Sequence, residues 1–226
     1  MEDSKWHTSP PTPLQNERGA FVRVAPPLIL ERGPGRPTLR GEVCGLILSG
    51  GLSSRMGEEK RLINYHEKTQ EQYLFDLLSN YFPAVYVSIN QNQKTDLPYI
   101  QDLDLPIKSP IVGIVSAFNH NPNIAWLVVA CDMPFVDEKT IELLIKKRNS
   151  EKFATAFENP KEHFPEPLLT IYEPKIFTKL QEAINEGRKS PMKVLQNLNV
   201  ELLQTFDSQW IMNINTLEER TAIKGF

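Results

Sequence analysis

Short apolar runs recur along most of the chain, and each is bounded by glycine, proline or polar residues. Runs of about four to eight apolar residues with such boundaries are typical of strands buried on both faces. The pattern predicts strands over residues 43–48, 84–90, 98–102, 125–132, 153–157, 168–172, 200–203 and 210–214.

Between several of these runs, apolar residues recur at spacings of three and four, which gives a helix one apolar face. This periodicity predicts helices over residues 70–82, 111–119, 175–184, 192–198 and 216–223, and one that Asp137 caps and that ends at Lys147. Buried strands that alternate with amphipathic helices predict a single Rossmann-like α/β domain, in which helices flank a mostly parallel sheet.

Residues 1–42 differ in composition from the rest of the chain. They contain seven of the 18 prolines, and proline removes a backbone donor and blocks helix interiors. We expect this Pro- and Gly-rich extension to be disordered or to form a loose arm. The folded domain is then expected to span residues 43–226.

Composition and charge exclude several classes of protein. The net charge of −3 gives no support to a nucleic-acid-binding surface, which needs a basic excess. No apolar run approaches the roughly 18 to 20 residues that span a bilayer, and the N-terminus lacks a signal pattern. We therefore expect a cytoplasmic protein. Cys44 and Cys131 both lie in apolar runs, which favours buried free thiols over a disulfide.

The segment 43–60 joins a buried strand to a glycine loop and then to two cations. Gly50 and Gly51 let the backbone approach a ligand closely, and free amides in such a loop form an anion-binding concavity. Arg55 and Lys60 can offset the charge of a phosphate. The segment matches neither the P-loop nor the dinucleotide-binding pattern. Its glycines alone also fit an ordinary surface turn.

Two further strands are predicted to end at an acid, Asp102 and Asp132. In open α/β sheets, ligands bind at the carboxyl ends of the strands. An aspartate there is a natural Mg²⁺ ligand, because Mg²⁺ is typically held by one or two carboxylates together with substrate phosphates. Alternatively, Asp132 forms a turn before Met133 and Pro134.

The segment from Leu48 to Lys60 resembles the signature L-x-G-G-x-S-x-R-M-G-x-D-K of nucleotidyltransferases that act on molybdenum cofactor, with Glu59 in place of the aspartate. Further segments resemble this guanylyltransferase family in the same order, namely residues 101–102, 109–113 (with Ser109 in place of a glycine), 130–135, 165–169 and 213–216. The resemblance implies a GT-A-like nucleotidyltransferase fold. It also implies that residues 165–169 face a pterin substrate.

The resemblance also implies roles for single residues. Those expected to contact the nucleotide are Leu48, Ser49, Gly50, Gly51, Lys60, Asn90 (or Ser88), Asp102 and Asp132. Those expected to carry catalysis are Lys60, Arg55 and Asp132, and those expected to hold Mg²⁺ are Asp132 and Asn215. Arg55 also fits a solvated charge, and Asn90 and Asn215 also fit ordinary turn residues.

The implied reaction transfers GMP from GTP to molybdopterin and releases pyrophosphate. The attacking group is a phosphate that is already an anion, so no strong general base is needed. Alignment and charge neutralisation would then carry catalysis. The implied partners are GTP or another NTP, molybdopterin, and molybdoenzymes or cofactor-insertion proteins. The protein is expected to be a monomer or a weak homo-oligomer, without nucleic-acid or membrane partners.

Other functions remain open from the sequence. A cytidylyltransferase would use CTP on the same cofactor, although Gly50-Gly51 favours GTP because the cytidylyl relatives tend to have Ala-Gly there. A sugar-phosphate nucleotidyltransferase shares the glycine loop, but residues 165–169 and 213–216 argue against it. A non-catalytic nucleotide-binding protein is also consistent with the departures at Glu59 and Ser109. The acid at Glu59 opposes phosphate binding unless it points away or pairs with Arg61.

Overall fold

The computed structural model describes residues 43–49, 59–160, 162–204 and 208–214. Several predictions fall outside these ranges. They concern the extension 1–42, the loop that contains Gly50, Gly51 and Arg55, and the helix 216–223 with Asn215 before it.

In the described part of the chain, seven strands form one sheet in the order β3-β2-β1-β4-β6-β5-β7. The strands are β1 Val43–Leu48, β2 Val85–Ile89, β3 Tyr99–Gln101, β4 Ala125–Ala130, β5 Ala154–Glu158, β6 Pro165–Tyr172 and β7 Glu201–Leu203. Neighbouring strands are parallel except where β6 pairs with β4 and β5. The prediction of a mostly parallel sheet is confirmed.

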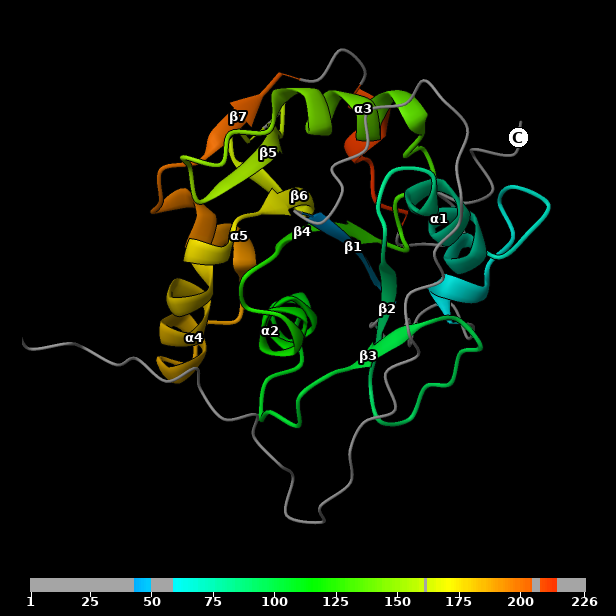
Figure 1. Cartoon of the computed structure of the whole chain (residues 1–226), viewed down its shortest axis with the longest axis horizontal. Coiled ribbons are helices and arrows are strands. Elements are labelled where there is room, and N and C mark those ends of the chain that lie inside the picture. The colour runs from blue at the N-terminus through cyan, green and yellow to red at the C-terminus, as the bar shows by residue number, and fades with distance from the viewer. Residues whose placement is uncertain (1–42, 50–58, 161, 205–207, 215–226) are drawn as a thin grey trace, which may run out of the picture.

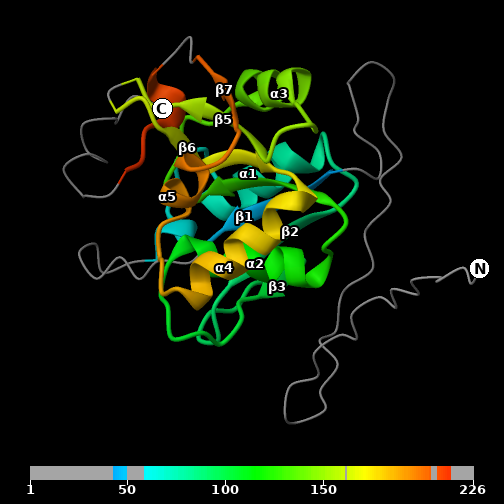
Figure 2. The ribbon, with the colours of Figure 1, turned by 90° about the vertical axis from the view of Figure 1, so that its left-hand side faces the viewer.

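Helices cover both faces of this sheet, as predicted (Figure 1). The α-helices are α1 Gln70–Ser79, α2 Pro110–His120, α3 Glu138–Lys147, α4 Phe177–Asn185 and α5 Pro191–Gln196, and the 3-10 helices are η1 Lys60–Leu62, η2 Pro174–Ile176 and η3 Ser208–Ile211. α1 and α3 lie on one face, and α2, α4 and α5 lie on the other (Figures 1 and 2). None of the described helices has the length and apolar character needed to cross a membrane.

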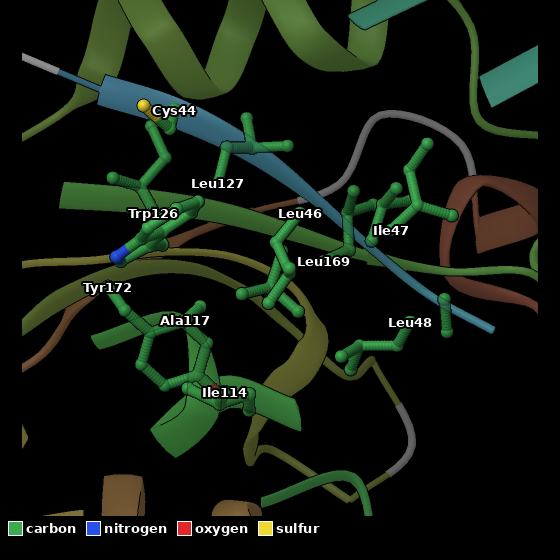
Figure 3. Packing of buried hydrophobic residues seen from close by; sticks show 14 of the residues in the cluster. Cys44, Leu46, Ile47, Leu48, Ile114, Ala117, Trp126, Leu127, Leu169 and Tyr172 are labelled. Carbon is green, nitrogen blue, oxygen red and sulfur yellow. The ribbon is translucent and has the colours of Figure 1, made fainter. Parts of the chain in front are cut away.

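The core lies on both faces of β1 and β4. Every residue of these two strands is buried, because helices cover the sheet above and below. Figure 3 shows Leu46 and Trp126 on the side of the sheet where Ile114 and Ala117 of α2 lie. Both cysteines are buried and free, as predicted.

The prediction of a last strand over residues 210–214 is wrong. The start of this segment belongs to the 3-10 helix η3, in which Trp210 packs on Phe157 with ring centroids 6.0 Å apart. Ile211 is buried. Ile214 donates its backbone N–H to the carbonyl oxygen of Asp132 at 2.7 Å. Ile211 and Ile214 are therefore buried by a helical turn that leads to the end of β4, without a strand, while Met212 is exposed.

The ends of the helices follow the local sequence. Asp137 caps α3 as predicted, and its carboxylate accepts from the backbone N–H of Thr140 at 2.9 Å. Ser109, which stands where the resembling family has glycine, caps α2 and accepts from the backbone N–H of Ile111 at 3.3 Å. Its hydroxyl also donates to the carbonyl of Lys189. Ser109 thus has a structural role at the start of α2.

The strand order places a switch point between β1 and β4. The chain runs outward from β1 to β2 and β3, and then returns to place β4 on the other side of β1. Crevices at the carboxyl ends of strands around such a point are where open α/β sheets bind ligands. The residues that follow β1, β2, β3 and β4 are therefore the candidates for a site.

Gly113 allows α2 to approach the ends of β1 and β2 closely. A Cβ at this position would overlap the hydroxyl of Ser88 and come within 2.8 Å of a methyl carbon of Leu48. Both neighbours are buried, so they have little room to move.

Replacing Gly113 by Ala should therefore destabilise the fold by about 1–3 kcal/mol, the range typical of overpacked cores. Denaturant unfolding measures this loss. Asn119→Ala, at an exposed position of the same helix, is the matched control and should change stability by less than about 0.5 kcal/mol. Equal stability of the two variants would contradict the close approach.

Candidate functional site

Lys60 and Asp132 meet at the switch point. The ammonium nitrogen of Lys60 lies 3.0 Å from Oδ2 of Asp132, and both side chains are 18% exposed. Lys60 opens η1, and Asp132 follows the end of β4. The turn that contains Asp132 is tied to β1, because Cys131 donates its N–H to the carbonyl of Leu48 at 3.1 Å. Two residues that the sequence singled out are thus brought together.

The second oxygen of Asp132 has the environment of a metal ligand. Oδ1 is buried and has no hydrogen-bond partner within the described residues, and Oδ1 of Asn213 is in the same state. Buried oxygens without partners are unfavourable, and a hard cation is the ligand that prefers carboxylate and amide oxygens. The described residues hold no cluster of three or more His, Cys, Asp or Glu side chains. A Mg²⁺ ion bound partly by substrate phosphates does not need one.

Glu166 is a buried acid that lies near Asp132. The antiparallel register pairs Val129, near the end of β4, with Leu169 of β6, so the start of β6, which contains Glu166, lies at the edge where β4 ends. Glu166 is 8% exposed, and its Oε1 accepts from the N–H of Leu168 at 3.0 Å. Burial, together with the nearby charge of Asp132, raises the pKa of Glu166 to about 7, against the lowering effect of that amide.

On the other side of β1, Ser88 and Asp102 form a second polar pair. The hydroxyl of Ser88 donates to Oδ1 of Asp102 at 2.5 Å. Asp102 follows β3 and is tied to β2, because its N–H donates to the carbonyl of Ile89 at 2.8 Å. Burial raises the pKa of Asp102, although the hydrogen bond from Ser88 opposes this. Ser88 lies beside Gly113 of α2. Asp102 follows β3, the strand that pairs with β2.

Ser49 and Asn90 make contacts within the protein. The hydroxyl of Ser49 donates to the carbonyl of Ser88 at 2.5 Å, and its N–H donates to the same oxygen at 3.3 Å. Oδ1 of Asn90 accepts from the N–H of Asn92 at 2.9 Å and so stabilises the turn after β2. Their contacts with a nucleotide, and that of Leu48, remain predictions.

Glu59 pairs with Arg61, which is one of the two arrangements that reconcile an acid here with phosphate binding. The Nε of Arg61 donates to Oε2 of Glu59 at 2.5 Å. The predicted site residues Gly50, Gly51, Arg55 and Asn215 lie outside the described residues.

The sequence names Glu166 only within the segment 165–169, which the family resemblance places at the pterin, and gives it no role of its own. The position of Glu166 follows from the insertion of β6 beside β4, which no local pattern shows. Asn213 was named only as part of the 213–216 segment, in which Asn215 was preferred. The bond from the N–H of Ile214 to the carbonyl of Asp132 places Asn213 and Ile214 beside the site, and the side-chain oxygen of Asn213 is buried there.

Comparisons with known proteins identify the family to which this chain is related. A family described as the MobA-like NTP transferase domain matches residues 45–202. A molybdenum cofactor biosynthesis bifunctional protein from Synechocystis is 36% identical over 77% of this chain and 52% of its own length. This chain therefore spans about half of that relative. A probable molybdenum cofactor guanylyltransferase from Flavobacterium johnsoniae is 30% identical over 76% of this chain and 92% of its own.

A similar structure is also known. The crystal structure of molybdopterin-guanine dinucleotide biosynthesis protein A from Archaeoglobus fulgidus matches with a TM-score of 0.66 and 25% sequence identity. The match covers 79% of this chain and 95% of that protein. The expected nucleotidyltransferase fold is thereby confirmed.

Replacing Glu166 by Gln should stabilise the protein at pH 8 and have little effect at pH 5. The pKa of this carboxyl is about 7 in the folded chain against an ordinary 4.5, so the folded state retains a proton that the unfolded state releases. Stability therefore falls as the pH rises from 4.5 to about 7. One pKa unit corresponds to about 1.4 kcal/mol, so denaturant unfolding in EDTA should show a gain of up to about 3 kcal/mol at pH 8.

Glu151→Gln is the control, because Glu151 is an exposed acid of the turn that precedes β5. It should leave stability nearly unchanged at both pH values. A gain from Glu166→Gln that is the same at pH 5 and pH 8 would show that burial of the charge is not its source.

Proposed function

This chain belongs to the MobA-like NTP transferase family, and from that premise we propose that it transfers GMP from GTP to molybdopterin with release of pyrophosphate. The ion pair between Lys60 and Asp132 carries this proposal. It provides a cation for phosphate oxygens and a carboxylate with a buried, unpartnered oxygen, both at the switch point of the sheet.

The nucleotide lies across the ends of β2, β1 and β4 in this proposal. Asp102 and Ser88 face the base and sugar, on the side of β1 toward β2 and β3. Lys60 faces the triphosphate, on the side toward β4. The domain that performs the reaction is proposed to span residues 43–226, and the family match over 45–202 supports its core.

In the reaction, an oxygen of the terminal phosphate of molybdopterin attacks the α-phosphorus of GTP. A new phosphorus–oxygen bond forms, and the bond from the α-phosphorus to the bridging oxygen of the β-phosphate breaks. The electron pair of that bond leaves with pyrophosphate. The nucleophile enters as an anion, so no side chain has to remove a proton, and Lys60 stabilises the charge that develops on the phosphate oxygens.

Asp132 is proposed to hold Mg²⁺ through Oδ1, with oxygens of Asn213 or Asn215 beside it. When bound, Mg²⁺ would neutralise phosphate charge and align the triphosphate. Lys60 already fixes Oδ2 of Asp132, so the carboxylate is oriented before a ligand arrives. This preorganisation is what phosphoryl transfer requires, because positioning and electrostatics account for most of its catalysis.

The choice of molybdopterin as acceptor has two supports. Relatives that match this chain are named molybdenum cofactor guanylyltransferases, and the segment 165–169 enters the site beside Asp132 at Glu166. The choice of GTP rests on Gly50-Gly51 in the sequence and on the names of the same relatives. CTP is the second candidate for the nucleotide donor.

A turnover assay tests the function. Pyrophosphate release should require an NTP, Mg²⁺ and molybdopterin together, and GTP should give the highest rate among GTP, CTP, ATP and UTP. Preference for CTP would reassign the donor and leave the reaction class in place. Release that does not depend on molybdopterin would contradict the proposed acceptor.

Asp132→Asn should reduce Mg²⁺-dependent turnover at least roughly 100-fold, the effect typical of removing one electrostatic contact to a transition state. The fold should persist, because Asn is isosteric with Asp, and thermal unfolding checks this. Asp104→Asn, an exposed acid after β3, is the control and should keep the wild-type rate. Near-normal turnover of the Asp132 variant would remove this residue from the metal site.

A further inference from the structure

The two neighbours of Lys60 are held in one polar network. Arg61 donates through Nε to Glu59 at 2.5 Å and through one terminal nitrogen to Glu71 at 3.1 Å. Another terminal nitrogen donates to the carbonyl of Lys94 at 2.9 Å. Arg61 and Glu71 are each 5% exposed. A planar guanidinium with several bonds of this kind has little freedom, so Arg61 is a fixed point in the fold.

Glu71 is fixed in turn by α1 and by the connection after β2. It lies in the first turn of α1, and its Oε1 accepts from the hydroxyl of Thr95 at 2.7 Å. The network therefore ties the start of η1 to α1 and to residues 94–95. No step of the proposed reaction uses any of these groups.

Gln93 links this network to the end of β1. Its Nε2 donates to the carbonyl of Ser49 at 3.3 Å and to Oε2 of Glu59 at 3.2 Å. Its Oε1 accepts from the N–H of Asn90 at 3.0 Å, which fixes the side chain on the turn after β2. Ser49 and Glu59 are the described residues on either side of residues 50–58 in the sequence. Gln93 thus joins the two points at which the chain leaves β1 and reaches Lys60.

We propose that Gln93, Glu59 and Arg61 are positioning residues that fix Lys60 relative to the ends of β1 and β4. Lys60 lies between two anchored neighbours in a 3-10 turn, while its own ammonium group meets Asp132. The backbone of Lys60 is therefore held by contacts on both sides. The importance of this placement for phosphate binding rests on the proposed function.

The arrangement also accounts for an acid next to a phosphate-binding lysine. The Oε2 atom of Glu59 accepts from both Arg61 and Gln93, and Arg61, which Glu59 shares with Glu71, offsets part of the negative charge. Charge-assisted bonds of this kind are among the stronger hydrogen bonds in proteins. Glu59 acts on Lys60 through the backbone, and it does not need to contact the nucleotide.

Gln93 is the residue through which the proposal is tested. Substitution of Arg61 would leave Glu71 buried without its ion pair and would destabilise the whole fold. Gln93 is only partly buried and uncharged, so Gln93→Ala removes the link and leaves no buried charge. Gln91→Ala is the matched control, because Gln91 is an exposed glutamine of the same turn.

The first measurement is the acetylation rate of the Lys60 amine in the ligand-free protein, read by mass spectrometry. Gln93→Ala should raise this rate at least about twofold, because the loss of a hydrogen-bond link loosens the ion pair with Asp132. Gln91→Ala should leave it unchanged. An unchanged rate in Gln93→Ala would overturn the positioning role. This measurement does not depend on the proposed function.

The second measurement is the affinity for inorganic triphosphate with Mg²⁺, by isothermal titration. Gln93→Ala should weaken binding about three- to tenfold, and the effect should disappear in a Lys60→Ala background, since residues that act through one another are not additive. The same loss in both backgrounds would show that Gln93 acts apart from Lys60, and would overturn the proposal. If the wild-type chain binds no triphosphate, the proposed function fails, and the acetylation rate alone decides the positioning role.

Discussion

The parallel pairing of β1 with β4 is the constraint on which the site depends. The two strands pair from Val43 with Ala125 to Leu48 with Ala130, so they end at the same edge of the sheet. Both are buried on both faces, and the apolar area removed from water stabilises this pairing far more than any polar contact at its end. The position of Asp132 beside the chain that follows β1 is therefore set by the core. The polar groups need only small adjustments to meet.

Some polar groups at this edge are paired with one another, and others are buried with little or no compensation for their burial. Lys60 is paired with Asp132, and Arg61 is paired with Glu59 and Glu71. Oδ1 of Asp132 and Oδ1 of Asn213 are buried without partners among the described residues, and Glu166 is held at a raised pKa by burial. These three groups lie near the end of β4 and the start of β6, where a cation and an acceptor are proposed to bind. Functional sites are where such unfavourable groups are retained.

Much of the fold and part of the site could be predicted from the sequence. The apolar run that ends at Asp132 and the N-cap residue Asp137 are local signals. Signals of this kind were sufficient to predict most of the strands and helices. Trp210 and Ile211 show the limit, because an apolar run of that length fits a strand or a buried helical turn equally well. Glu166 and Gln93 show another limit. The position of Glu166 depends on which strand lies beside β4, and that of Gln93 depends on which segments the turn after β2 contacts. Such long-range contacts leave no trace in local periodicity.

Because β6 is antiparallel to β4, it reaches the proposed site with a different end from the parallel strands. A strand that runs against its neighbours begins where they end, so β6 enters the ligand-binding edge with its first residues, whereas β1 and β4 reach it with their last. The connection from β5 to β6 therefore opens onto the edge where the acceptor is proposed to bind, and β1 and β4 separate it from the strands that carry or precede Ser88 and Asp102. Insertions or deletions in residues 159–164 could alter which acceptor is taken while the donor half stays unchanged. A fold of this kind can diversify its acceptors without rebuilding its nucleotide site.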